Sequence, residues 1–122
     1  MKNESTGLIR IVKAAGYSLK GFRAAWKNEA AFRQEVIAVL PFIILSFFLD
    51  VTSVERILLV GVLVLVVIIE LLNSAVESAI DRIGPEFHVL SGRAKDFGSA
   101  AVLLTIILAI FTWVSVFWPR WF

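Results

Sequence analysis

Three long apolar blocks dominate the pattern of hydrophobic and polar positions along the chain. They predict membrane spans over about residues 30–49, 57–80 and 91–118. The first block is strongly apolar only from Val36, and it reaches the roughly 20 residues that a bilayer requires when it is extended back to Ala30. The pattern therefore predicts an all-α membrane protein with three transmembrane helices.

The connections between these spans carry turn and break signals. Residues 50–56 are short and polar enough for a tight hairpin. A break is expected at 83–86, because Pro85 lacks an amide donor and disfavours helix at the residue before it. Ser91 is a candidate N-cap for the third span. Pro41 lies within the first span and is expected to kink it or to leave a backbone carbonyl unpaired.

Residues 5–29 follow a different pattern, in which apolar residues recur every three or four positions and basic residues occupy the other faces. The apolar set is Leu8, Ile11, Val12, Ala15, Leu19, Phe22 and Trp26, and the basic set is Arg10, Lys13, Lys20, Arg23 and Lys27. This pattern predicts a basic amphipathic helix, or a pair of helices, in the interface of an anionic leaflet. Packing of the same face against the protein itself is equally compatible with the pattern.

Composition indicates one small membrane unit. The 122 residues are 59% hydrophobic and have a mean hydropathy of +0.87, which is too apolar for an ordinary soluble domain. We therefore predict a single domain over residues 1–122. The absence of cysteine excludes disulfides, thiolate metal sites and cysteine nucleophiles. The single histidine, His88, argues against a multi-histidine metal site within one chain.

The basic residues are unevenly distributed and predict a topology. Most precede the first span, and a second group lies between the second and third spans: Lys2, Arg10, Lys13, Lys20, Arg23, Lys27 and Arg33, then Arg82, Arg93 and Lys95. The positive-inside rule then places the N-terminus and the second connection in the cytoplasm, and the C-terminus on the opposite side. Trp113 and Trp118 are expected near the far interface.

A polar stripe interrupts the second span. At about 100° per residue, its members fall on one helix face: Glu70, Asn73, Ser74, Glu77 and Asp81. An acidic residue near the bilayer centre costs roughly 2.5–3.5 kcal/mol on insertion scales, so it usually faces a partner or a cavity. Glu70 lies deepest and suits a proton acceptor or carrier.

Other groups complete two possible chemistries. Glu77 and Glu29 could share a hard cation such as Mg²⁺. Arg10, His88 and Lys95 could meet phosphate oxygens. A proton acceptor, a cation pair and basic groups suit phosphoryl transfer, although a proton- or cation-coupled transport subunit could use the same stripe.

Several segments resemble a known family. Residues 70–77 read Glu-Leu-Leu-Asn-Ser-Ala-Val-Glu, and residues 90–101 read Leu-Ser-Gly-Arg-Ala-Lys-Asp-Phe-Gly-Ser-Ala-Ala. With residues 10–18 and 24–35, they strongly resemble the prokaryotic integral-membrane diacylglycerol kinases of the proteobacterial type. The resemblance covers essentially the whole chain.

The resemblance implies a multi-pass homotrimer in the bacterial inner membrane, with a periplasmic C-terminus and active sites shared between neighbouring subunits. Each chain would have three transmembrane helices and one surface helix. The implied reaction transfers the γ-phosphoryl group of ATP, with Mg²⁺, to the primary hydroxyl of diacylglycerol and gives phosphatidic acid. Diacylglycerol, ATP and membrane lipids are then the partners, with no nucleic acid. Recycling of diacylglycerol during envelope synthesis would be its role.

The same resemblance assigns residues. Glu70 would be the proton acceptor, and Glu29 and Glu77 would hold the metal. The expected ATP contacts are Arg10, Tyr17, Glu29, Glu77, Glu86, His88, Lys95 and Asp96. The expected contacts with the lipid substrate are Arg10, Ala14, Ala30, Ala31, Phe32, Glu35, Arg56, Glu70, Asn73, Ser99 and Trp113.

Structural interpretations of these residues stay open at the level of sequence. Glu70 and Asn73 could make inter-helix hydrogen bonds, Arg56 could be an ordinary loop charge, and Trp113 could be an interface anchor. A polyprenol kinase and a small transport subunit are the alternative functions. ATP-dependent lipid phosphorylation separates the enzymes from the transporter, and lipid competition separates the two enzymes.

Overall fold

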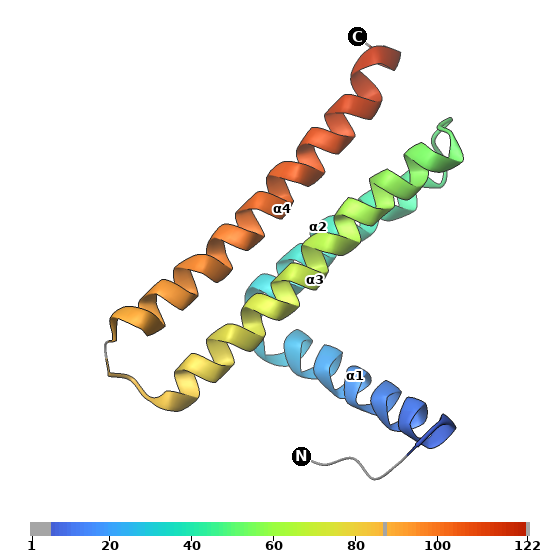
Figure 1. Ribbon diagram of the computed structural model, residues 1–122. Helices are drawn as coiled ribbons and strands as arrows, with labels where there is room; N and C mark the ends of the chain where they lie inside the picture. Colours follow the sequence, from blue (N-terminus) through green and yellow to red (C-terminus); the bar gives the residue numbers. More distant parts are fainter. Residues whose placement is uncertain (1–5, 87, 122) are drawn as a thin grey trace.

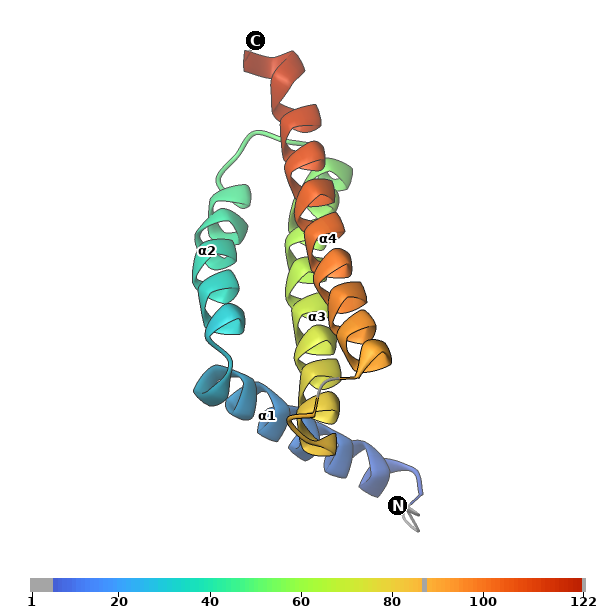
Figure 2. The ribbon, with the colours of Figure 1, turned by 90° about the vertical axis from the view of Figure 1, so that its left-hand side faces the viewer.

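The computed structural model describes residues 6–86 and 88–121, and helices account for most of them. In chain order these are α1 (Leu8–Asn28), α2 (Ala30–Ser46), α3 (Ser53–Ile83) and α4 (Val89–Trp121). Helices α2, α3 and α4 run alongside one another, whereas α1 turns away from them near the end of the bundle that carries the α3–α4 turn (Figures 1 and 2). The expected all-α architecture is confirmed.

Helix α1 is a single element, so the alternative of a pair of helices over residues 5–29 is wrong for the described residues. It ends at Asn28 because Glu29 is extended, with φ −116° and ψ 102°. The Arg33 guanidinium donates to the carbonyl oxygens of Trp26 at 2.7 Å and Lys27 at 3.2 Å. Those carbonyls belong to the last turn of α1, where no intrahelical donor remains. The expected boundary at residue 29 is therefore correct.

Helix α2 is shorter than the predicted span, because it ends at Ser46 and not near residue 49. It continues through Pro41 as helix. Its 17 residues extend only about 26 Å at 1.5 Å per residue. Among the described residues, two helices, α3 and α4, are long and apolar enough to cross a membrane. The third span remains an expectation.

Helix α3 begins with a capping box that the sequence analysis missed. The Thr52 side chain accepts from the Glu55 amide at 3.1 Å, and the Glu55 carboxylate accepts from the Thr52 amide at 2.9 Å. These bonds satisfy two amides at the helix start. The expected hairpin over residues 50–56 is therefore wrong in its second half, since residues from Ser53 onward are helical.

The predicted break after the second span is confirmed. Helix α3 ends at Ile83, and Gly84 follows with φ 138°, a conformation that residues with a side chain rarely adopt. The prediction of Ser91 as N-cap is wrong. Helix α4 begins at Val89, where the Leu90 amide donates to His88 Nδ1 at 3.0 Å. The imidazole supplies the capping acceptor three residues before the expected serine.

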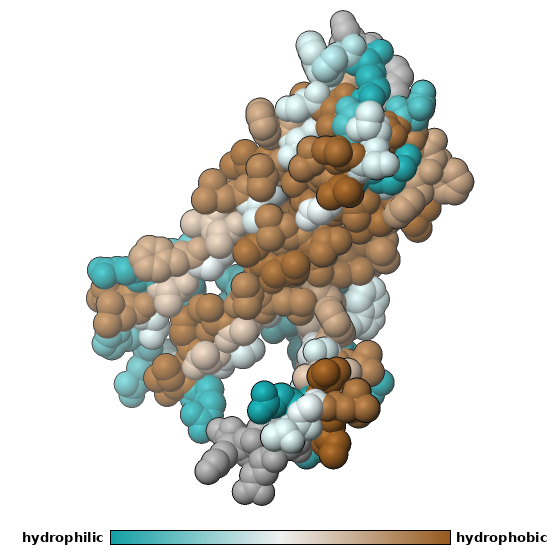
Figure 3. Space-filling model, turned by 45° about the vertical axis from the view of Figure 1, so that its right-hand side comes forward, coloured by the Kyte–Doolittle hydropathy of each residue, from teal (hydrophilic) through white to brown (hydrophobic). Residues whose placement is uncertain are grey.

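The three-helix bundle is held by an apolar core that lies between α2, α3 and α4. Its buried members are Val39, Leu63, Val66 and Ala109. Trp113 packs edge-on to Phe42, with ring centroids 5.5 Å apart, and its indole donates to the Leu59 carbonyl at 3.1 Å. Around this core, the face in Figure 3 is a broad hydrophobic band with hydrophilic residues toward its ends.

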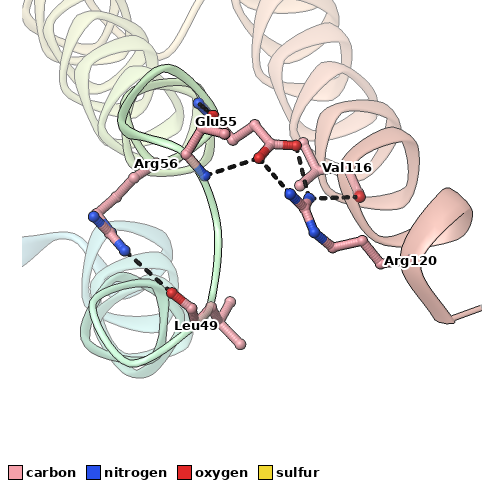
Figure 4. A network of polar contacts seen from close by, with 6 residues as sticks. Leu49, Glu55, Arg56, Val116 and Arg120 are labelled. Atoms are coloured by element: carbon pink, nitrogen blue, oxygen red, sulfur yellow. Dashed lines mark hydrogen bonds and ion pairs between the residues drawn. The ribbon is translucent and has the colours of Figure 1, made fainter.

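Two arginines organise the end of the bundle opposite α1 (Figure 4). Arg120 near the end of α4 makes two 2.7 Å hydrogen bonds to the Glu55 carboxylate at the start of α3. Arg56 donates to the carbonyls of Ser46 and Leu49, each at 3.1 Å. The paired charges join two helix ends, and Arg56 satisfies carbonyls at the end of α2.

Thr52→Ala removes one half of the capping box and should lower the free energy of unfolding by about 1 kcal/mol. Reversible unfolding by sodium dodecyl sulfate in mixed micelles measures the loss. Thr52→Ser keeps the hydroxyl acceptor and should stay close to the parent. Equal stability of Thr52→Ala and the parent would show that this cap contributes nothing measurable.

Candidate functional site

The polar stripe of α3 turns inward, as its spacing predicts. Glu70 is only 4% exposed and Ser74 is 8% exposed, although both lie on an otherwise apolar helix. Asn73 and Glu77 are half-buried on the same side. The upper part of the stripe is therefore shielded within one chain, whereas Asp81 at its end is exposed.

Carboxyl groups from three elements gather around Glu70. Glu29, at the junction of α1 and α2, and Glu77 are both close enough to interact electrostatically with it. Glu35 of α2 does the same, and its Oε2 is buried without a hydrogen-bond partner in the described part of the chain. Carboxylates this close in apolar surroundings need protons or a cation to offset their repulsion. Glu70 can therefore accept a proton, and a pair of these carboxylates could share a cation.

Asn73 links the stripe to Glu77. Its Nδ2 donates to Glu77 Oε1 at 3.3 Å, across one helical turn. Its Oδ1 is buried and accepts no hydrogen bond from any described residue. The amide thus presents its donor to the carboxylate and its acceptor to α4.

A cleft of about 640 Å³ lies between α1 and α3 and includes Glu29 and Ser74. Its volume is in the range of about 300–1,000 Å³ that is typical of small-molecule sites. Its polar lining residues are Ser18, Asn28, Glu29, Ser74 and Ser78. The sequence analysis missed Ser18 and Ser78, although the four-residue spacing of Ser74 and Ser78 extends the stripe.

A second cleft, of about 200 Å³, lies at the turn between α3 and α4. It brings together Glu86, His88 and Lys95, which are three of the residues expected to contact a nucleotide. Lys95 also makes a 2.9 Å ion pair with Asp81, and both side chains are exposed. Exposed pairs of this kind contribute little to stability, so the ammonium can exchange Asp81 for an anionic ligand at small cost.

The remaining expected nucleotide contacts do not join this cleft in one chain. Arg10 and Tyr17 are exposed on α1, whose N-terminal half projects away from the other helices (Figure 1). The Tyr17 ring lies 5.9 Å from the Lys20 ammonium. Asp96 is exposed on α4.

Two adjoining apolar grooves connect two residues of the expected lipid set. One, of about 330 Å³, has Glu35 in its lining, and the other, of about 240 Å³, has Trp113. They share the lining residues Phe42, Leu63, Ala109 and Ile110. Glu35 is the single charged residue in either described lining, so it marks the polar end of a long apolar surface.

Other members of the lipid set are scattered. Ala14, Ala30, Ala31 and Ser99 are exposed, whereas Phe32 is buried at 4% exposure. Arg56 lies at the opposite end of the bundle, on the carbonyls of Ser46 and Leu49 (Figure 4). Arg56 therefore does not join the carboxyl cluster within one chain.

Comparison with known proteins gives one consistent similarity. The family model for prokaryotic diacylglycerol kinase matches residues 16–117. The chain is 58% identical over 120 residues to the diacylglycerol kinase of Escherichia coli strain K12, covering 98% of each chain. It is 49% identical to that of Pseudomonas aeruginosa over 111 residues (91% of this chain and 90% of the relative). It is 46% identical to that of Haemophilus influenzae over 113 residues (93% and 96%).

The chain has no cysteine, so single cysteines can report the openness of the cleft between α1 and α3. Ser78→Cys should react quickly with a membrane-impermeant maleimide in detergent, because Ser78 is exposed in the lining. Ser46→Cys is the matched control and should be protected, because Ser46 is 0% exposed. Protection of both positions would mean that another chain covers the cleft in the assembled protein.

Proposed function

Since the chain belongs to the prokaryotic diacylglycerol kinase family, we propose that it transfers the γ-phosphoryl group of ATP to the primary hydroxyl of diacylglycerol. Phosphatidic acid and ADP are the products. The observation that carries the mechanism is Glu70, which is buried in an apolar helix within electrostatic reach of Glu29 and Glu77. A lipid hydroxyl and the phosphates of a nucleotide would meet at such a place.

Glu70 would act as the general base. A lipid presents its hydroxyl at the edge of the apolar region, so the group that accepts its proton must lie there too. In the step, the hydroxyl proton passes to the Glu70 carboxylate while the oxygen forms a bond to the γ-phosphorus. The bond from that phosphorus to the bridging oxygen of ADP breaks, and ADP leaves with the electron pair.

Glu29 and Glu77 would hold Mg²⁺. Among the described residues, no group of three or more acidic or histidine side chains is arranged to hold a metal ion. Mg²⁺ in kinases usually takes one or two carboxylates and completes its shell with phosphate oxygens and water, so the proposal needs only this pair. When bound, the ion would neutralise phosphate charge. Asn73, which donates to Glu77, would hold that carboxylate in orientation.

The nucleotide would lie toward the turn between α3 and α4. The small cleft there is lined by Glu86, His88 and Lys95, and Lys95 is also within electrostatic reach of Glu77. Its ammonium would neutralise phosphate oxygens. Arg10, Tyr17 and Asp96 would complete the ATP site.

The lipid would lie along the apolar grooves between Glu35 and Trp113, with its hydroxyl at the carboxyl cluster. Acyl chains are apolar, and these linings are almost wholly apolar, so the match is one of hydrophobic contact. The remaining proposed substrate contacts are Arg10, Ala14, Ala30, Ala31, Phe32, Arg56, Glu70, Asn73 and Ser99.

The proposed assembly is a homotrimer in the bacterial inner membrane, with α2, α3 and α4 as spans and α1 on the cytoplasmic surface. The single chain leaves much apolar surface exposed on every helix, including Leu8 at 76%, Ile37 at 61%, Ile57 at 69% and Phe111 at 67%. Lipid and neighbouring copies would cover it. Neighbours would also supply the ATP contacts on α1 that one chain keeps apart, so the sites would be shared. The N-terminus would be cytoplasmic and the C-terminus periplasmic, and envelope synthesis would supply the diacylglycerol.

Glu70→Gln removes the base without changing side-chain size, and it should lower kcat by about 10²–10⁴-fold. The measurement is phosphatidic acid formed from diacylglycerol and ATP in mixed micelles with Mg²⁺. Asp50→Asn, which removes a carboxylate in the loop between α2 and α3, is the control and should retain activity. An active Glu70→Gln enzyme would exclude Glu70 as base, and an inactive parent would overturn the kinase assignment for this lipid.

The trimer has its own test. The protein mass in detergent, corrected for bound detergent, should be three times the 13.6 kDa of one chain. Light scattering coupled to size exclusion gives this number independently of activity. A mass equal to one chain would exclude the trimer.

A further inference from the structure

Gly98 of α4 differs from the other glycines in what it faces. All seven glycines lie in the described part of the chain, and six of them have no neighbouring side chain within 4 Å of where a Cβ would stand. A Cβ built on Gly98 would instead overlap Asn73 Oδ1 of α3, and it would lie 3.2 Å from Asn73 Cγ. The hydrogen that replaces that Cβ in glycine therefore points at the amide oxygen.

This contact falls on an oxygen that has no other partner. Asn73 Oδ1 is buried and accepts no hydrogen bond from the described residues, while Nδ2 of the same amide donates to Glu77. A Cα–H group next to a carbonyl oxygen is a weak donor that recurs at helix–helix contacts. The reverse orientation of the amide would place two oxygens against each other at Glu77, so the contact with Gly98 agrees with the orientation seen.

We propose that Gly98 is a positioning residue, which by its lack of a side chain holds the Asn73 carboxamide in place to donate to Glu77. A methyl group at position 98 would push the amide oxygen aside and rotate the donor away from Glu77. The carboxylate would then lose the hydrogen bond that orients it toward the cation. This role rests on the proposed function, because it concerns the proposed metal ligand Glu77.

A simpler role would be that a small residue lets α3 and α4 approach closely, as is common in membrane helices. The two roles differ in what they predict. A packing role predicts a loss of stability that does not depend on the Asn73 amide. A positioning role predicts that Gly98→Ala behaves as Asn73→Ala does, and that the two substitutions together cost no more than either one.

The experiment compares Gly98→Ala, Asn73→Ala and the double variant in the full-length protein, with Gly61→Ala in α3 as the matched helical-glycine control. Loss of an orienting partner typically costs 10–100-fold in metal affinity or activity. We therefore expect the Mg²⁺ concentration for half-maximal activity to rise about tenfold or more in Gly98→Ala and Asn73→Ala, and no further in the double variant. Gly61→Ala should match the parent, because nothing lies within 4 Å of that position.

A second readout does not depend on activity. The side-chain amide resonances of Asn73, assigned by their loss in Asn73→Ala, should shift in Gly98→Ala and stay in place in Gly61→Ala. Unshifted resonances, a parental Mg²⁺ requirement in Gly98→Ala, or additive effects in the double variant would each overturn the positioning role. An inactive parent with shifted resonances would refute the kinase assignment and leave the Gly98 contact intact.

Discussion

Polar groups on an apolar helix must find partners within the protein, because hydrocarbon offers them none. The stripe of α3 meets this constraint by turning inward, where Glu70 and Ser74 are buried. The other elements are placed accordingly: the junction of α1 and α2 brings Glu29 toward Glu70, and α4 brings Gly98 against Asn73. The packing that buries the stripe therefore also brings the residues of the candidate site together.

The same constraint governs the helix ends, where backbone groups lack intrahelical partners. The Thr52 cap starts α3, His88 starts α4, and Arg33 and Arg56 cover carbonyls at the ends of α1 and α2. Between these polar ends lies the apolar core. Its helices are held together mainly by side-chain packing and by the hydrogen bond from the Trp113 indole to the Leu59 carbonyl. Such an arrangement suits a protein whose outer surface contacts lipid.

Much of the fold could be predicted because its signals are local. The period of apolar residues gave the four helical segments, and Gly84 with Pro85 gave the break after α3. Two errors lie at helix starts, where side-chain hydrogen bonds decide the boundary, and a third lies at the end of α2, which stops at Ser46. Ser91 is of a residue type that often caps helices. The His88 imidazole, three positions earlier, instead accepts the hydrogen bond from the Leu90 amide at the start of α4. The inward face of the stripe also followed from spacing, since Glu70, Asn73 and Glu77 repeat at helical intervals.

The sequence by itself determined the membrane class, the helices, the acidic stripe and the family, because hydrophobic period and contiguous motifs are properties of neighbouring residues. Tertiary structure alone decided which distant groups meet. Arg120 binds Glu55 across 65 positions of sequence, Gly98 faces Asn73, and Ser18 joins Ser78 around one cleft. These meetings depend on the rotation and register of one helix against another, and side-chain packing fixes both only when the helices come together.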